Sequence, residues 1–176
     1  MKKEREIATG QEVEKIIFRL AGEIQAKIDL KNLALVGIRR RGVELAARLQ
    51  NILQKKSVKI PMGILDITLY RDDLSAVAKQ PVVRETQIQF DLEEKDILLV
   101  DDVLFTGRTI RAALSELVDF GRPKSIKLLT LVDRGHRELP IQPDFTGKFI
   151  QTESNQPIEV HLKELDGEDK ILLIEP

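Results

Sequence analysis

The stretch Ile97-Leu98-Leu99-Val100-Asp101-Asp102-Val103-Leu104-Phe105-Thr106-Gly107-Arg108-Thr109 decides the fold class of this chain. The apolar residues at its start are typical of a strand that is buried on both faces of a parallel sheet. We expect this strand over 96–102, a polar loop over 103–108 and a helix over 110–120. A strand, a polar turn and a helix in this order form half of a βαβ unit, so the stretch favours an α/β fold.

The same alternation of strands and helices continues on both sides of this stretch. A capping box from Thr9 to Glu12 opens a predicted helix with apolar residues at helical spacing as far as Ile28. Further strands are expected at 33–38, 58–70, 126–132, 145–150, 158–162 and 171–174, and a further helix at 43–53. The pattern predicts a parallel sheet with right-handed crossovers, flanked by helices, within a single domain spanning 1–176.

Composition excludes several classes of protein. The 176 residues include 28 Lys and Arg, 29 Asp and Glu, and no Cys, which excludes a disulfide scaffold, a thiolate zinc site and a cysteine nucleophile. No apolar run approaches the roughly 18 residues of a membrane span, so no membrane partner is expected. The charged N-terminal residues are not followed by an apolar stretch, which argues against a signal peptide and for a cytoplasmic location.

The segment 106–109 has the features of a phosphate-binding turn. A glycine allows the backbone to approach a ligand closely, and the first N–H groups of the following helix favour an anion. Two threonine hydroxyls and the Arg108 guanidinium add donors. The carboxylates of Asp101 and Asp102, directly before this turn, can accept hydrogen bonds from sugar hydroxyls or hold Mg²⁺. Either feature alone is also typical of an ordinary turn, but together they indicate a site for a ribose 5-phosphate.

Three polar loops follow apolar strands, at 39–42, 101–109 and 133–137. Ligands of open parallel sheets bind at the carboxyl ends of the strands, so we expect these loops to surround the site. Basic residues dominate 38–59 and 121–148, whereas 149–176 is acidic. Although the net charge of −1 argues against non-specific binding of nucleic acid by the whole protein, the basic stretches can build a local anion site.

The stretch 97–109 resembles the binding motif for 5-phosphoribosyl 1-diphosphate (PRPP) of type I phosphoribosyltransferases. Two further stretches, 65–74 and 131–141, are similar to the PyrR family, whose members are bifunctional: they attenuate transcription of pyrimidine operons and are uracil phosphoribosyltransferases. The run Asp133-Arg134-Gly135-His136-Arg137-Glu138-Leu139-Pro140 carries most of this resemblance. It implies a flavodoxin-like parallel sheet with a small hood and a flexible lid loop.

The resemblance implies transfer of phosphoribose from PRPP to uracil, which gives UMP and diphosphate, with Mg²⁺ as cofactor. It implies that the whole stretch 97–109 binds PRPP and that Asp101, Asp102, Arg39 and Arg40 are catalytic, with both aspartates holding the metal. Arg39, Arg40, Arg41 and Gly42 match the diphosphate loop of the family. A lid over 71–90 is expected to exclude water, with Tyr70 and Arg71 at its hinge. Val132, Asp133 and Arg134 are expected to hold uracil. Asp133 can also assist deprotonation of the base, and an ion pair to an arginine is an equal expectation for it.

The resemblance also implies binding to the leader of pyrimidine-operon mRNA, promoted by uridine nucleotides, and a homodimer or higher homo-oligomer. Arg19, Arg137 and Lys148 are the candidate RNA contacts, with Arg134 beside them. This sequence departs from the family at Gly22, Phe149, Gln151 and Glu153, where RNA-facing residues are expected. The carboxylate of Glu153 is unfavourable beside RNA phosphates. The four differences therefore argue against RNA binding, but they do not affect the expected catalytic residues.

Three other functions stay open at this point. The chain can be mainly an RNA-binding, nucleotide-sensing regulator with weak catalysis, or a transferase for another nucleobase such as hypoxanthine. A phosphoacceptor signalling domain has the same type of fold, but it requires acidic residues after its first strand, where this chain has three arginines.

Overall fold

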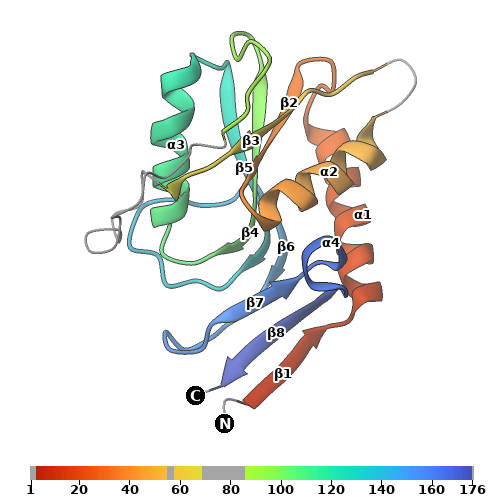
Figure 1. The fold of residues 1–176 in the computed structure, drawn as a ribbon, viewed down its shortest axis with the longest axis vertical. Helices are drawn as coiled ribbons and strands as arrows, with labels where there is room; N and C mark the ends of the chain where they lie inside the picture. Colours follow the sequence, from red (N-terminus) through yellow and green to blue (C-terminus); the bar gives the residue numbers. More distant parts are fainter. Residues whose placement is uncertain (1–2, 55–57, 69–85, 176) are drawn as a thin grey trace.

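The computed structural model describes residues 3–54, 58–68 and 86–175, and it contains two sheets (Figure 1). The larger sheet is parallel, with the strand order β3-β2-β4-β5-β6, and the smaller is antiparallel, with the order β1-β8-β7. The strands are β1 (Lys3–Ala8), β2 (Leu33–Ile38), β3 (Met62–Leu65), β4 (Asp96–Leu104), β5 (Ser125–Asp133), β6 (Phe145–Phe149), β7 (Ile158–His161) and β8 (Lys170–Glu175). The helices are α1 (Gly10–Lys27), α2 (Arg41–Leu53), α3 (Arg108–Phe120) and α4 (Lys163–Asp166). The predicted α/β fold with a parallel sheet is confirmed.

The central strands are apolar along their length because both faces of the parallel sheet are covered. All six residues of β2 are buried, and Val36 pairs with Leu99 of β4, which in turn pairs with Leu128 of β5. Helices α1 and α2 cover one face of this sheet and α3 covers the other (Figure 1). The side chains therefore divide into two apolar clusters, one on each side of the sheet.

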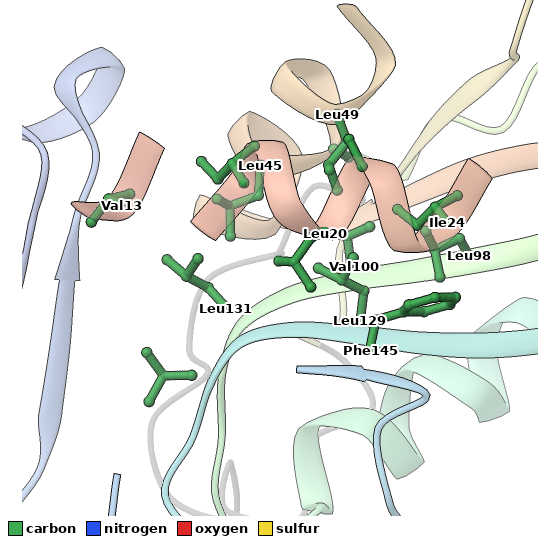
Figure 2. Packing of buried hydrophobic residues seen from close by; sticks show 14 of the residues in the cluster. Val13, Leu20, Ile24, Leu45, Leu49, Leu98, Val100, Leu129, Leu131 and Phe145 are labelled. Carbon is green, nitrogen blue, oxygen red and sulfur yellow. The ribbon is translucent and has the colours of Figure 1, made fainter. Parts of the chain in front are cut away.

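The larger cluster joins α1 and α2 to the sheet (Figure 2). Leu20 of α1 and Leu49 of α2 are about 1% exposed and pack against fully buried Leu98 of β4. Burial of one such leucine contributes roughly 1.5–3 kcal/mol to stability. The predicted capping box of α1 is present: the backbone N–H of Thr9 donates to the Glu12 carboxylate at 2.8 Å, and the Glu12 N–H donates back to the Thr9 hydroxyl at 3.4 Å.

The smaller sheet shares this cluster, through Ala8 of β1, Val160 of β7 and Leu173 of β8. β7 also contacts β4, so the small sheet lies beside the carboxyl end of the larger one (Figure 1). Strands at 145–150, 158–162 and 171–174 were predicted, and β6, β7 and β8 confirm them. β1 has no apolar pattern of its own, since four of its six residues are exposed, and only pairing with β8 defines it.

Three predicted boundaries are wrong. β4 does not end at Asp102, because Val103 and Leu104 continue the pairing with Val132 and Asp133 of β5. Helix α3 begins at Arg108 instead of residue 110, and α2 begins at Arg41 instead of residue 43. In both helices the polar residues of the first turn mask the apolar periodicity, so the sequence pattern starts later than the helix.

The predicted lid over 71–90, with Tyr70 and Arg71 at its hinge, lies mostly outside the described residues. Within 58–68, the described part of the predicted strand region 58–70, the strand is Met62–Leu65. On the far side of 69–85, the Thr86 hydroxyl donates to the buried carboxylate of Glu116 on α3 and accepts the N–H of Asp66 at 2.9 Å. The described ends of this segment are therefore fixed to each other and to α3.

Candidate functional site

The three polar loops predicted to surround a site meet at the carboxyl edge of the parallel sheet. The start of α2 lies directly against β4: a Cβ added at Gly42 would lie 2.3 Å from the carbonyl oxygen of Val100. On the other side of β4, the N–H of Arg134 donates to the Leu104 carbonyl at 3.1 Å and the N–H of Glu138 to the Thr106 carbonyl at 2.9 Å. The loops at 39–42, 101–109 and 133–137 are therefore in direct contact through their backbones.

The turn at 106–109 has the geometry of an anion site. Gly107 is the N-cap of α3 and adopts a left-handed conformation with φ of +92°, which favours glycine. The Thr106 hydroxyl accepts the N–H of Arg108 at 3.3 Å. The Arg108 guanidinium donates to Glu138 at 2.6 Å, but both side chains are about half exposed. The helix N-terminus and the Thr106 hydroxyl thus lie at one turn, an arrangement that suits an anion such as phosphate.

The two carboxylates before this turn lie in different surroundings. Asp101 is 6% exposed, and its carboxylate accepts the N–H of Asp102 at 2.9 Å. Asp102 is half-buried and accepts the N–H of Val103 at 2.9 Å. It lines a cavity of about 310 Å³ together with Arg41 and the strand β7. Asp102 is therefore the carboxylate that can reach a ligand in this cavity, whereas Asp101 is largely enclosed by protein.

The arginines of the loop at 39–42 are not equivalent. Arg39 donates its backbone N–H to the Leu65 carbonyl at 2.9 Å, and the Arg39–Arg40 peptide bond is cis. Arg40 is the N-cap of α2 and its side chain makes no capping hydrogen bond. Arg41 is ion-paired to Asp166 of α4, with 2.8 Å between Nη2 and Oδ1. Arg41 thus lines a cavity with Asp102, and its guanidinium is held by Asp166 of α4.

Asp133 uses both carboxylate oxygens inside its own loop. Oδ1 accepts the N–H of Gly135 at 2.9 Å, and Oδ2 accepts Nη2 of Arg137 at 2.6 Å. The Arg137 guanidinium also donates to the carbonyls of Phe105 at 2.9 Å and Ile141 at 2.8 Å. Of the two alternatives for Asp133, the ion pair to an arginine is the one that the structure contains.

Arg134 is likewise engaged with its own chain. Its guanidinium donates to the Thr152 hydroxyl at 3.2 Å and to the carbonyls of Glu153 and Ser154 at 3.0 and 3.1 Å. It lies 4.0 Å from the centre of the Phe105 ring, a cation–π distance. Burial lowers the pKa of Arg134. The loop 133–137 is therefore a rigid support for Phe105, and its side chains are not simply open to a ligand.

Two further residues at this end of the sheet are Val132, in β5, and His136, in the loop 133–137. Val132 is fully buried within β5, paired with Val103 and Lys148 on its two sides. His136 Nε2 lies 2.7 Å from the Thr152 carbonyl, and its ring meets Phe105 edge-on. These contacts hold the His136 ring against Thr152 and Phe105 of its own chain.

The three predicted RNA contacts all bind their own chain. Arg19 pairs with Glu23 and donates to the carbonyl of Gly147 on β6. Lys148 donates to the Ile7 carbonyl at 3.3 Å, and Arg137 has the partners given above. Arg19 is still half exposed at its side chain, so it can contact a further partner as well.

Sequence reasoning missed the residues that β7 and α4 bring to the site. Glu159 and His161 line the cavity with Asp102, and their side chains lie 3.7 Å apart. Asp166 reaches Arg41 from a position 125 residues away in the chain. In the sequence, the alternation of apolar residues over 158–162 predicted a strand. Nothing in this pattern indicated that the strand would lie beside the carboxyl ends of the parallel strands.

Comparison with known proteins agrees with this geometry. The profile of the phosphoribosyl transferase domain family matches residues 4–165. "Bifunctional protein PyrR" of Deinococcus deserti is 54% identical over 169 residues, which cover 95% of this chain and 92% of the relative. The protein of the same name from Elusimicrobium minutum is 53% identical, over 97% of each chain. The chain belongs to the PyrR family. The resemblance seen in the sequence is thereby confirmed.

Solved structures show how widely the fold of this PyrR-family chain is shared. A hypoxanthine phosphoribosyltransferase from Staphylococcus aureus superposes with a TM-score of 0.74 at 20% identity, over 98% of this chain and 91% of that one. A purine phosphoribosyltransferase from Pyrococcus horikoshii gives 0.61 at 27% identity, over 82% and 86%. The type I phosphoribosyltransferase fold is confirmed. Because proteins named as hypoxanthine and purine phosphoribosyltransferases share this fold, the fold alone does not identify the base that this chain uses.

Within 3–54, 58–68 and 86–175, no helix is both long and apolar enough to cross a membrane. The same residues contain no group of three or more His, Asp or Glu side chains placed to hold a metal ion by themselves. A divalent ion at Asp101 and Asp102 would therefore take most of its remaining ligands from substrate or water, as Mg²⁺ commonly does.

Proposed function

We propose that this chain transfers the 5-phosphoribosyl group of PRPP to N1 of uracil, releasing diphosphate, and that uridine nucleotides also control its binding to pyrimidine-operon leader RNA. The observation that carries the catalytic half is the contact between three loops of different chemistry at one sheet edge. A phosphate turn, a carboxylate pair and an arginine loop match the three charged or hydroxylated parts of PRPP.

Each loop has a task in this reaction. The helix N-terminus at Gly107, with the hydroxyls of Thr106 and Thr109, binds the 5-phosphate. Asp101 and Asp102 accept hydrogen bonds from the ribose hydroxyls. Arg39, Arg40 and Arg41 face the diphosphate, whose negative charge grows as its bond to C1 breaks, and fixed positive charge there lowers the barrier.

Magnesium fits the donor set at this site. The carboxylate oxygens of Asp101 and Asp102 are hard ligands, and Asp102 opens on the cavity. Bound Mg²⁺ would neutralise charge on the departing diphosphate. The residues named here need no covalent intermediate, which agrees with a chain that contains no cysteine.

We assign Val132, Asp133 and Arg134 to the uracil subsite through their backbone and through the position of Phe105, because the two charged side chains already bind protein groups. Asp133 accepts two hydrogen bonds and is therefore a support for the loop instead of the acceptor of the N1 proton. Strand β7 lines the cavity together with Asp102.

The regulatory half rests on membership of the PyrR family. Its candidate RNA contacts are Arg19, Lys148 and Arg137, and a homo-oligomer is expected as well. The side chain of Arg19 is more exposed than that of Arg137. Recognition by phosphate contacts requires binding that weakens steeply as salt rises. A leader transcript should therefore bind more tightly with UMP present and more weakly as KCl is raised.

The direct test is formation of labelled UMP from uracil, PRPP and Mg²⁺, with hypoxanthine, guanine and orotate as parallel substrates. UMP as the dominant product supports the proposed reaction. A purine or orotate product would reassign the base. Absence of any product from folded protein that binds PRPP would favour a nucleotide-sensing regulator, which the RNA titration then tests.

A further inference from the structure

Asp166 occupies a fixed position at the end of the one-turn helix α4. Its Oδ2 accepts the N–H of Leu162 at 2.8 Å, and its own N–H donates to the Leu162 carbonyl at 2.7 Å. This reciprocal pair closes the turn that joins β7 to β8. Backbone groups of the turn therefore orient this carboxylate independently of its contacts with other side chains.

The second oxygen of this carboxylate holds Arg41. Oδ1 lies 2.8 Å from Nη2, in a pair whose side chains are 18% exposed for Asp166 and 35% for Arg41. Burial alone would raise the pKa of Asp166, but the Leu162 N–H and the Arg41 guanidinium outweigh it and lower that pKa. The pair is thus charged at neutral pH and joins α4, the turn between β7 and β8, to the first residue of α2.

Arg41 is placed where this pairing can matter for binding. It lines the same cavity as Asp102, and it follows Arg39 and Arg40 in the loop assigned to the diphosphate. A free arginine side chain loses rotamer entropy when a ligand orders it. A guanidinium that the protein already orders loses less on binding, so a substrate anion is held more tightly.

We propose that Asp166 is a positioning residue for the diphosphate loop: it fixes the Arg41 guanidinium beside the cavity before PRPP binds. This inference rests on the proposed phosphoribosyl transfer. It gives the small sheet a part in binding the diphosphate group, in addition to covering the site. Asp166 touches no substrate itself and acts only through Arg41.

Helix α4 offers a matched control. Glu164, two residues earlier on the same turn, pairs with Arg48 at 2.6 Å, about two turns further along α2, and Arg48 is not among the residues that line the cavity. Glu164→Gln and Asp166→Asn therefore each remove one charge from α4 and one ion pair to α2. Only the second pair includes a residue of the diphosphate loop.

The experiment measures KM for PRPP, KM for uracil, kcat and the inhibition constant of diphosphate in both variants. We expect Asp166→Asn to raise KM for PRPP and the diphosphate constant about five- to tenfold, with KM for uracil within twofold of wild type. Glu164→Gln should leave all four values unchanged. Equal changes in the two variants, or a change in uracil KM alone, would overturn the proposal.

A double-mutant cycle isolates the pair. In an Arg41→Ala background, Asp166→Asn should have no further effect on PRPP, because the side chain through which it acts is gone. Full additivity of the two substitutions would overturn the proposal. If Asp166→Asn does not fold, Asp166→Glu keeps the charge one methylene further out and should raise KM for PRPP less than Arg41→Ala does; an equal or larger rise would contradict the inference.

The wild-type protein separates this inference from the proposed function. If it forms no UMP but binds inorganic diphosphate in calorimetry, the proposed reaction fails and the same cycle is measured on diphosphate affinity. Loss of affinity in Asp166→Asn but not in Glu164→Gln then supports the positioning role. A wild-type chain that binds neither PRPP nor diphosphate would overturn both.

Discussion

Arg137 and Asp133 form an ion pair of 2.6 Å within the loop 133–137. The two side chains are 15% and 10% exposed, and the same guanidinium donates to the carbonyl of Phe105 in the segment 97–109. One arginine therefore fixes both the proposed base loop and the proposed phosphate loop. Asp133 and Arg137 therefore have a structural role that requires no bound ligand.

Replacement of Arg137 by alanine should destabilise the protein by about 3 kcal/mol or more, because it leaves the Asp133 carboxylate buried without its partner. Chemical denaturation monitored by circular dichroism measures this loss. Arg5→Ala is the matched control, since Arg5 and Glu175 form an exposed pair of 3.8 Å that contributes little. Similar stabilities for the two variants would show that the Arg137 network is not structural.

Gly42→Ala should both destabilise the protein and impair use of PRPP. The new Cβ would lie 2.3 Å from the Val100 carbonyl and 3.3 Å from Cα of Asp101, so α2 must move away from β4. Gly22→Ala on α1 is the control: no atom lies within 4 Å of its added Cβ, and the exchange should stabilise the helix by roughly 0.5–1 kcal/mol. Thermal unfolding of both variants, with KM for PRPP, checks the contrast. A Gly42→Ala protein with normal KM would separate the arginine loop from the site.

Several of these features were predictable from the sequence, for physical reasons that are clear in hindsight. The apolar run before Asp101 had to be a buried strand, and the capping residues Thr9 and Glu12 had to begin a helix, because both patterns are local. Gly107 was correctly placed at a turn, and it is the N-cap of α3 in a left-handed conformation that favours glycine. Local patterns therefore predicted which loops would be polar and at which end of the sheet they lie.

What the sequence did not reveal depends on contacts between distant residues. Arg134 and Arg137 look like free cations in the sequence, yet partners up to 32 residues away engage them. Asp166 is one of seven acids in 149–176 and has no local feature that distinguishes it. β1 exists only because β8 pairs with it. Side-chain partners and edge strands of this kind are set by tertiary packing, which periodicity does not encode.

The ion-pair network of Arg48 should make stability fall at low pH. Arg48 donates to Glu164 at 2.6 Å and to Asp169 at 2.7 Å. The hydrogen bond from Arg48 lowers the pKa of Glu164 below its ordinary 4.5, and for Asp169 the bonds from Arg48 and the Lys163 N–H outweigh burial and lower the pKa below 3.8. A carboxylate with a lower pKa in the folded state stabilises fully above its unfolded pKa and loses this contribution as the pH falls through the folded value.

The expected result is a constant contribution above about pH 5 and a progressive loss below about pH 4. Urea denaturation at pH 7, 5 and 3.5 measures it in wild type and in Glu164→Gln. The variant should be less stable at pH 7 and should lose less stability on acidification. A variant that follows the wild-type pH profile with a constant offset would show that other carboxylates dominate acid unfolding.

Asp102→Asn should lower kcat about a hundredfold while leaving the free energy of unfolding within about 0.5 kcal/mol of wild type. The Asp102 carboxylate lines the cavity and accepts the Val103 N–H through one oxygen, a bond that the asparagine carbonyl can keep. The lost charge is the one that would face ribose hydroxyls and Mg²⁺.

Asp101→Asn is the informative comparison. Because Asp101 is enclosed by protein, this variant should lose stability together with activity. Steady-state kinetics over a range of Mg²⁺ concentrations, with denaturation of the same samples, separates the two residues. Full activity in both variants would remove the carboxylate pair from the reaction and leave the phosphate turn as a binding site without chemistry.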